Sequence, residues 1–193
     1  MADSSLHNEI ESIKRIRAND VEAFSEVFRR YYEPLCFFAG RYLHDIQSAE
    51  GVVQDVFVRL WESRDTLSIQ SSLKSYLYAS VRNASLNTIK RENFTSSLDY
   101  EEERSDTPDM QPDIQLESNE LAVALEQAMN GLAPKCRQIF CMAKYDGLSY
   151  QEIAEVLNIS INTVKTQLKR ALKSLGRSLQ HFQILLLFLR FWW

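Results

Sequence analysis

The stretch Ser149–Leu175, SYQEIAEVLNISINTVKTQLKRALKSL, predicts two short helices joined by a tight turn. Ser149 and Glu152 have the Ser-x-x-Glu spacing of a capping box, which satisfies free N–H groups at a helix start. Asn158 tolerates the left-handed conformation of a turn, and Ser160 can cap the second helix. The apolar residues of that helix have the spacing of one buried stripe: Val164, Leu168, Ala171, Leu172 and Leu175. The stretch therefore predicts a helix-turn-helix.

The opposite face of the second helix carries cations and a hydroxyl. Its outward residues are Lys165, Thr166, Lys169, Arg170 and Lys173. Such groups can meet the acceptors on base edges and phosphates in the DNA major groove, although a solvated basic face on a small bundle has the same pattern. From Leu132 to the last residue there are nine Lys or Arg and three Asp or Glu, whereas the whole chain has a net charge of −4. This local basic patch favours DNA contact.

The composition of the 193-residue chain indicates an all-α protein. It has 45% hydrophobic residues, five glycines and four prolines, and no useful run of period-two alternation. Cys36, Cys136 and Cys141 form no CxxC pair and lie far from the histidines, so neither a disulfide framework nor a metal site is expected. No phosphate-cradling glycine loop or nucleophile motif is present, which argues against catalytic residues and against a cofactor. The first residues lack the apolar segment of a secretory signal.

Charge divides the chain into two helical domains. Between Asp99 and Glu120 there are nine acidic residues and one basic residue, with few apolar groups. Such a segment cannot bury enough surface to order itself and predicts a flexible acidic linker. The expected parts are a first domain over residues 8–92, the linker over 93–117, the helix-turn-helix domain over 118–178 and an apolar tail over 179–193.

Three helices are expected in the first domain. Asn19 and Glu22 predict a cap for a long helix, a second helix begins near Ser48, and a third begins at Leu73. The third helix has a polar face whose amides and cations could position nucleic acid, although such a face is commonly only solvated. The residues of interest on this face are Asn83, Asn87, Lys90 and Arg91.

Three segments together carry a family resemblance. They are AEGVVQDVFVRLWE at 49–62, YLYASVRN at 76–83 and the stretch from LAPKCRQIF at Leu132 to Leu175, separated by the acidic gap. In this order they resemble a bacterial sigma factor of the extracytoplasmic-function group, over about Asp20–Arg91 and Asn119–Arg177. The resemblance implies a cytoplasmic transcription initiation subunit that binds core RNA polymerase, recognises promoter DNA and opens it. It implies no small-molecule substrate, and an anti-sigma factor as a further partner.

The helix at 49–62 is similar to the one that docks on the clamp-helix coiled coil of the largest polymerase subunit. By this resemblance the polymerase contacts are Gln54, Asp55, Arg59 and Trp61. An exposed Asp–Arg pair beside apolar groups suits a helix-on-helix interface, but Trp61 fits simple core packing equally well. Gly51 departs from the family, which more often has an acidic residue there.

The remaining roles concern DNA. The segment from Tyr76 resembles the one that holds the melted minus-ten element, in which Asn83 and the preceding loop, Leu67–Ser72, would hold an extruded base. Asn87 belongs to the same face, and Lys90 and Arg91 would hold the phosphate backbone. The helix-turn-helix resembles the reader of the minus-thirty-five element, with its groove contacts at Lys165, Thr166, Lys169 and Arg170. Gln167 replaces a residue that is commonly basic in the family.

Two segments keep alternative interpretations. By resemblance the linker would thread the polymerase channel that later accepts the transcript, and a solubilising spacer is the alternative. In the tail, Ile184–Trp193 has nine apolar residues out of ten, interrupted by Arg190. This is about half of the roughly 20 residues needed to cross a bilayer. Cover for the tail could come from the second domain, from an anti-sigma factor or from a membrane surface, and protein contact is preferred.

Two other function classes remain to be tested. An autonomous helix-turn-helix regulator, acting as a dimer on a palindromic site, would account for the second domain and leave the first unexplained. A helical enzyme lacks any motif in its favour.

Overall fold

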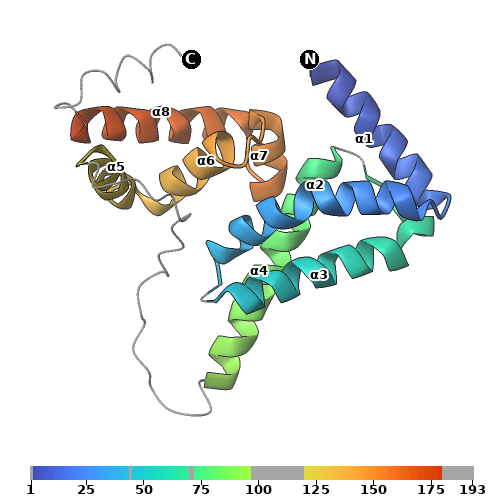
Figure 1. Cartoon of the computed structure of the whole chain (residues 1–193). Coiled ribbons are helices and arrows are strands. Elements are labelled where there is room, and N and C mark those ends of the chain that lie inside the picture. Colours follow the sequence, from blue (N-terminus) through green and yellow to red (C-terminus); the bar gives the residue numbers. More distant parts are fainter. Residues whose placement is uncertain (1, 44, 70–71, 97–119, 180–193) are drawn as a thin grey trace. The chain divides into compact units, whose positions relative to one another are not determined.

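A computed structural model describes residues 2–43, 45–69, 72–96 and 120–179. The chain divides into two compact units, Met1–Met110 and Gln111–Trp193. All regular elements in the described ranges are helices, which confirms the all-α fold (Figure 1). The predicted acidic linker and the apolar tail lie outside the described residues, apart from their ends. No helix within the described part is long and apolar enough to cross a membrane.

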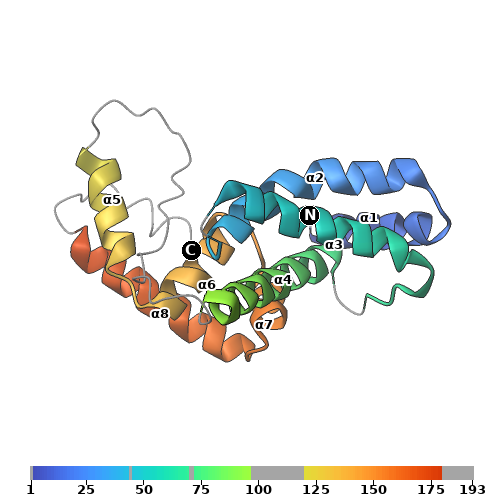
Figure 2. The same cartoon turned by 90° about the horizontal axis from the view of Figure 1, so that it is seen from below.

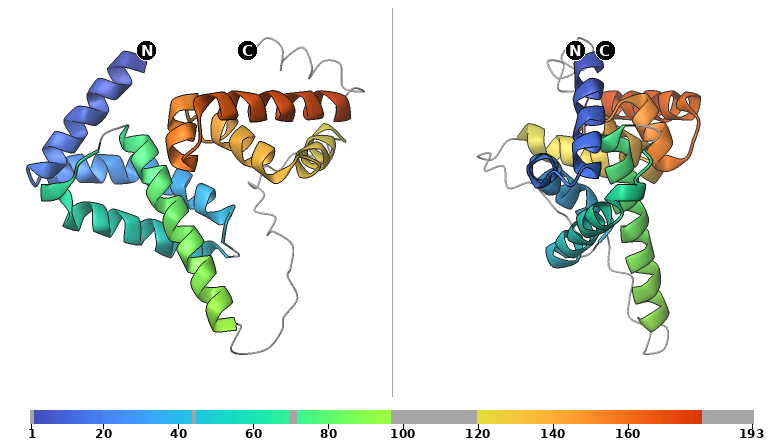
Figure 3. Two further views of the ribbon diagram at one scale, coloured as in Figure 1. Left: turned by 180° about the vertical axis from the view of Figure 1, so that it is seen from behind. Right: turned by 90° about the vertical axis from the view of Figure 1, so that its right-hand side faces the viewer.

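The first unit is built around three long helices. Figure 2 shows α2 and α3 side by side in opposite directions, and Figure 3 shows from behind how α4 crosses them. A shorter helix, α1, packs on α2 and on α4. The bounds are α1 Ala2–Arg17, α2 Val21–Gly40, α3 Ile46–Glu62, the 3-10 turn η1 Arg64–Thr66, and α4 Leu73–Ser96.

Of the three predicted starts in this unit, that of α4 at Leu73 agrees with the structure, and the other two differ by one or two residues. The cap of α2 is Asp20, not Asn19: the Asp20 carboxylate accepts the N–H groups of Glu22 and Ala23 at 3.0 Å. Asn19 has a left-handed backbone, with φ of 64°, and belongs to the turn after α1. Helix α3 begins at Ile46 rather than near Ser48, because Asp45 caps it by accepting the N–H of Ser48 at 2.7 Å.

Apolar stripes along α2, α3 and α4 form the core of the first unit. Most of their residues are at most 5% exposed: Val27, Tyr31, Leu35, Phe38, Val53, Val56, Phe57, Leu60, Leu73, Leu77 and Val81. Ala84, which follows on the same side of α4, is only half-buried. Phe24 and Phe28 are also half-buried, and their rings lie against α3.

The second unit is a four-helix bundle that confirms the helix-turn-helix. Ser149 and Glu152 make both bonds of the capping box, Asn158 has φ of 52° and ψ of 52°, and Ser160 caps α8 by accepting the N–H of Thr163. The expected stripe of α8 is buried except for the half-buried Leu172. Helices α5, α6 and α7 all contact α8. Their bounds are α5 Glu120–Asn130, α6 Pro134–Lys144, α7 Tyr150–Leu157 and α8 Ile161–Ser178.

Candidate functional site

The outward face of α8 is a cationic strip. Its members are all exposed and follow the helix at spacings of one, three or four residues: Lys165, Thr166, Lys169, Arg170 and Lys173. No ion pair within the described residues involves a lysine or arginine of this strip. The Thr166 hydroxyl donates to the Asn162 carbonyl at 2.8 Å, so its oxygen remains an acceptor for an incoming donor. The charge of the strip is thus available to an anionic ligand such as a phosphate backbone.

Gln167 lies beside this strip but faces the interior. Its side chain is half-buried and its Oε1 accepts a hydrogen bond from the Sγ of Cys136, on α6, at 3.0 Å. Gln167 therefore serves helix packing in this chain. Sequence spacing could not show this, because the two residues are 31 positions apart.

A second polar strip follows α4. Asn83, Asn87, Lys90 and Arg91 stand at i, i+4, i+7 and i+8, which places them on one face, and all four are exposed. Arg82 precedes the strip and is half-buried, and its Nε atom is buried without a hydrogen-bond partner. The structure thus brings the four predicted minus-ten residues together. Of the predicted Leu67–Ser72 loop, Leu67 is buried and residues 70–71 lie outside the described part.

The start of α4 is contacted by a residue that the sequence did not reveal. Glu9 of α1 is 6% exposed, and its Oε2 accepts the backbone N–H of Leu73, the first residue of α4, at 2.9 Å. Its Oε1 accepts the hydroxyl of Tyr31 at 2.9 Å. No helix was expected over residues 2–17, and the cap joins residues 64 positions apart. No local pattern could have indicated this contact.

An aromatic seam joins α2 to α3. Phe24 contacts Trp61 with ring centroids 5.0 Å apart, and Phe28 contacts Phe57 at 4.8 Å. One turn further along α2, the hydroxyl of Tyr32 accepts from the side-chain amide of Gln54 at 3.2 Å. Because aromatic pairs of this kind each contribute about 1 kcal/mol beyond their buried area, the seam holds the two helices in register.

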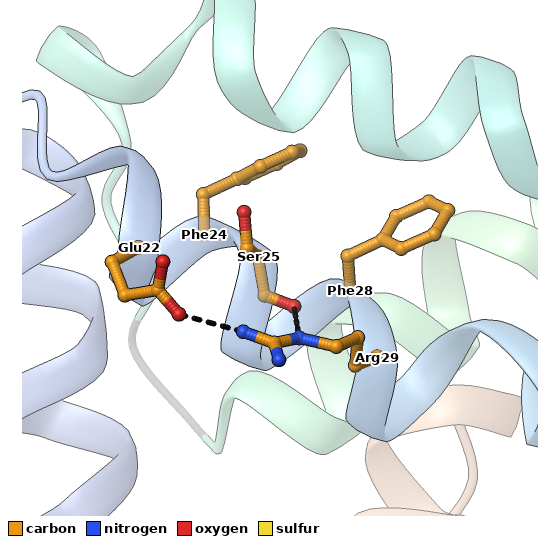
Figure 4. A pocket seen from close by; sticks show the side chains of 5 residues that line it. All are labelled: Glu22, Phe24, Ser25, Phe28 and Arg29. Carbon is orange, nitrogen blue, oxygen red and sulfur yellow. Dashed lines mark hydrogen bonds and ion pairs between the residues drawn. The ribbon is translucent and has the colours of Figure 1, made fainter.

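The pocket drawn in Figure 4 opens beside this seam. Phe24 and Phe28 project from α2 toward α3, and Glu22, Ser25 and Arg29 complete its lining. Arg29 donates to the carboxylate of Glu22 at 2.6 Å, and its Nε donates to the Ser25 carbonyl at 3.3 Å. The ends of the phenyl rings are therefore reachable from solvent, next to a fixed polar border.

The exposed side of α3 combines charge with one apolar group. Gln54, Asp55 and Arg59 are exposed, and no ion pair within the described residues joins Asp55 to Arg59. Between them stands Val58, which is 53% exposed and which the sequence analysis did not single out. The sequence could have indicated Val58, because a valine on the polar, solvent-exposed face of an amphipathic helix is unusual.

Trp61 is held from two sides. One side of its indole meets Phe24, and the guanidinium of Arg64 lies over the ring with its Cζ 4.6 Å from the centroid. Arg64 also donates to the Trp61 carbonyl at 2.7 Å and to the side chain of Asn19. Trp61 is half-buried, so it contributes to packing and still presents an edge to solvent.

The arrangement is suited to binding. Among the described residues there is no group of three or more His, Cys, Asp or Glu side chains that could hold a metal ion. Helix α8 with its cationic strip defines a DNA-binding helix-turn-helix protein. The separate first unit, with its polar strip and aromatic seam, adds further binding surface that a helix-turn-helix domain alone does not have.

Comparisons with known proteins agree with this class. Residues 27–95 match the family described as Sigma-70 region 2, and residues 122–175 match Sigma-70, region 4. The ECF RNA polymerase sigma factor SigW of Bacillus subtilis is 27% identical over 177 residues, covering 87% of this chain and 95% of that protein. The ECF RNA polymerase sigma-E factor of Escherichia coli K12 is 24% identical over 183 residues, covering 87% and 92%.

Two solved structures share the fold. CnrH, solved in complex with the cytosolic domain of CnrY, has a TM-score of 0.60 at 17% identity and covers 90% of this chain and 98% of that chain. The sigma factor RpoE from Bartonella quintana, solved with the anti-sigma factor NepR, has a TM-score of 0.57 at 24% identity and covers 81% and 96%.

The chain belongs to the sigma-70 family and to its extracytoplasmic-function group. It is an RNA polymerase-binding, promoter-recognising sigma factor and not an enzyme. The alternative of an autonomous dimeric regulator is not favoured, because the first domain matches sigma region 2.

Proposed function

We propose that the exposed side of α3 and the aromatic seam beside it form the surface that docks on core RNA polymerase. Gln54, Asp55, Arg59 and Trp61 are its polar and aromatic contacts, and Val58 supplies an apolar centre. The observation that carries this proposal is the pair of charges on Asp55 and Arg59, which are exposed one helical turn apart. At an interface, such charges fix register while aromatic anchors hold affinity.

The seam prepares this surface before a partner arrives. Gln54 is held by Tyr32, and Trp61 is held by Phe24 and Arg64. Side chains that are already fixed lose less conformational entropy on binding, which favours affinity. Asp55 and Val58 lie between these two fixed points along α3.

The two DNA strips have separate tasks in this proposal. On α8, Lys165, Thr166, Lys169 and Arg170 contact the minus-thirty-five element in the major groove. On α4, Asn83 and Asn87 contact bases of the melted minus-ten strand, because an amide offers both a donor and an acceptor to a base edge. Lys90 and Arg91 continue the same face and hold phosphates.

We also propose an anti-sigma factor as a regulatory partner. RpoE from Bartonella quintana was solved with an anti-sigma factor, and CnrH was solved with the cytosolic domain of CnrY. This chain has the same fold and presents half-exposed aromatic rings beside α3. The site of action is the cytoplasm, where core polymerase and promoters are found.

The test is run-off transcription on a pool of genomic fragments with core RNA polymerase. Wild-type protein is expected to produce new transcripts, and their start sites give the promoter sequences. Asp55→Arg reverses the charge at the proposed interface and is expected to abolish these transcripts and co-elution with core. Glu11→Arg makes the same charge change on an exposed residue of α1 and is expected to leave both intact.

Two results would contradict the proposal. If Asp55→Arg and Glu11→Arg had equal effects, the α3 surface would not be the polymerase site. If the wild-type protein neither stimulated transcription nor co-eluted with core, promoter recognition on polymerase would itself be excluded.

A further inference from the structure

Glu9 of α1 is a buried carboxylate. It is 6% exposed, whereas Ile16 of the same helix and Leu73 of α4 are at most 1% exposed. Burial of a carboxylate is unfavourable unless its oxygens are hydrogen-bonded, and an apolar residue of similar size often gives equal or greater stability. A carboxylate at this position therefore indicates that its hydrogen bonds serve to fix the geometry of the helices more than to stabilise the fold.

Both oxygens of Glu9 have defined partners from different helices. Oε1 accepts the hydroxyl of Tyr31 on α2, and Oε2 accepts the N–H of Leu73 on α4, each at 2.9 Å. Tyr31 is itself buried. The carboxylate thus joins α1, α2 and the first residue of α4 at one point.

Helix α4 does not need Glu9 merely to begin. Ser72 already provides a local cap, because its hydroxyl oxygen accepts the N–H of Ser75 at 3.0 Å. Glu9 binds a different N–H, that of Leu73, from a distant part of the chain. A carboxylate at a helix N-terminus also interacts favourably with the helix dipole. The added contact fixes where the end of α4 lies against α1 and α2.

The position of this end matters because α4 carries the whole minus-ten strip. Asn83 stands ten residues after Leu73, which is about 15 Å along the helix axis. A helix behaves as a rigid rod over this length, so a tilt at its start displaces the amides that face DNA. Contacts that must reach particular base atoms lose strength when they are displaced by about 1 Å.

We propose that Glu9 is a positioning residue for promoter opening, which orients α4 for binding of the unpaired minus-ten strand. It does not touch DNA in this proposal, and it acts through Leu73. The inference rests on the proposed role of α4 and adds a residue outside the recognised polymerase and DNA segments.

The test compares two affinities of the assembled holoenzyme. The probe is a single-stranded oligonucleotide of the non-template strand across the minus-ten element of a promoter mapped by the run-off experiment, with a scrambled strand as its control. Glu9→Leu retains approximate size but has no acceptor oxygen, so the bonds to Tyr31 and Leu73 are both lost. We expect binding of the strand to weaken about tenfold, with core polymerase affinity unchanged.

Arg15→Gln is the matched control on the same helix. Arg15 binds Asp20 and Glu26 and so ties α1 to the start of α2, and within the described residues it has no hydrogen bond to α4. This variant is expected to bind the strand like the wild type, although it loses an anchor of α1. Tyr31→Phe leaves the Leu73 bond in place and is expected to have a smaller effect than Glu9→Leu.

The outcomes separate this inference from the proposed function. Equal strand binding by Glu9→Leu and wild type would overturn the inference, as would parallel losses of core binding and strand binding, since these indicate general destabilisation. Failure of the wild-type holoenzyme to prefer the minus-ten strand over the scrambled one would overturn the proposed role of α4 itself.

Discussion

Asp20 carries three interactions on one carboxylate. It accepts the N–H groups of Ala23 and Glu22, and the guanidinium of Arg15 donates to it at 2.8 Å. The bond from Ala23 and then that from Arg15 lower the pKa of Asp20 from its ordinary value of 3.8. Because the pKa is lower in the folded chain, the stabilisation is complete above about pH 4 and is lost as pH falls through the folded pKa.

Asp20→Asn tests this charge, because asparagine is an equally good helix cap. We expect the variant to be less stable than wild type at pH 7, and the difference to shrink when both are compared near pH 3. Urea unfolding at the two pH values, followed by circular dichroism, measures it. A difference that did not change with pH would mean that the charge of Asp20 is unimportant.

Gly51 is the residue of α3 that departs from the family pattern, and the structure gives no steric reason for it. A Cβ atom built at this position meets nothing within 4 Å. Glycine within a helix is less favourable than alanine by about 1 kcal/mol, so Gly51→Ala is expected to stabilise the protein by about that amount. Thermal unfolding should show a raised Tm.

Gly147→Ala is a useful contrast to Gly51→Ala. Gly147 has φ of 60°, a left-handed conformation that is strained for alanine, so this variant should lower the Tm. A lower Tm for Gly51→Ala would show that an unseen packing constraint acts on α3.

At the scale of single residues, prediction from sequence fails where two neighbouring residues can both serve as the helix cap. Asn19 and Asp20 are both good capping residues, and pattern alone favoured Asn19 because of its spacing to Glu22. The left-handed turn that follows α1 takes Asn19, which leaves Asp20 to cap α2. The choice depends on a helix over residues 2–17 that was not expected.

At the scale of one element, the cationic strip on α8 leads to a prediction of how promoter binding depends on salt concentration. Lys169 is exposed and takes part in no ion pair within the described residues, so a phosphate contact by it would release about one counterion. Lys169→Gln in the holoenzyme is therefore expected to lower the slope of log K against log salt concentration by about 1. Binding is measured by titration at several salt concentrations on a run-off promoter.

Glu155→Gln is the matched control for Lys169→Gln, since it changes an exposed charge on α7. It should leave the salt slope unchanged. An unchanged slope for Lys169→Gln would exclude a phosphate contact by that lysine.

Helix ends and turns whose residues lie close together in the sequence were predicted well. The capping box of α7, the left-handed Asn158 and the cap of α8 are all formed by residues within four positions of one another. Contacts between distant residues were not predictable: Glu9 to Leu73, Arg64 to Asn19 and Cys136 to Gln167 depend on how helices pack. The helical period predicted which residues share each face of the candidate site. It could not predict the contacts between distant residues that hold those helices in place.

At the scale of the whole molecule, each unit has its own core. The buried residues of α2, α3 and α4 pack with one another, and those of α5 to α8 form a separate group. Fragments Met1–Met110 and Gln111–Trp193 are therefore each expected to fold alone and to unfold cooperatively by circular dichroism. The first should still bind core polymerase.

A shorter fragment provides the control for this prediction. Residues 1–62 end with α3 and lack Leu73, Leu77 and Val81, which complete the core of the first unit. This fragment is expected to remain largely unfolded. If it folded as well as Met1–Met110, α4 would not be part of that core.

Cys136 and Gln167 are bound to each other across two helices, so a change in either affects both. A mutation that replaced Gln167 with the basic residue common in the family would leave the Cys136 thiol without its acceptor and place a cation at a half-buried position. Descendants of this chain that acquire such a residue are therefore expected to change Cys136 as well. A change of promoter preference through Gln167 would then require substitutions at both Gln167 and Cys136, because a substitution at one of them alone would be selected against.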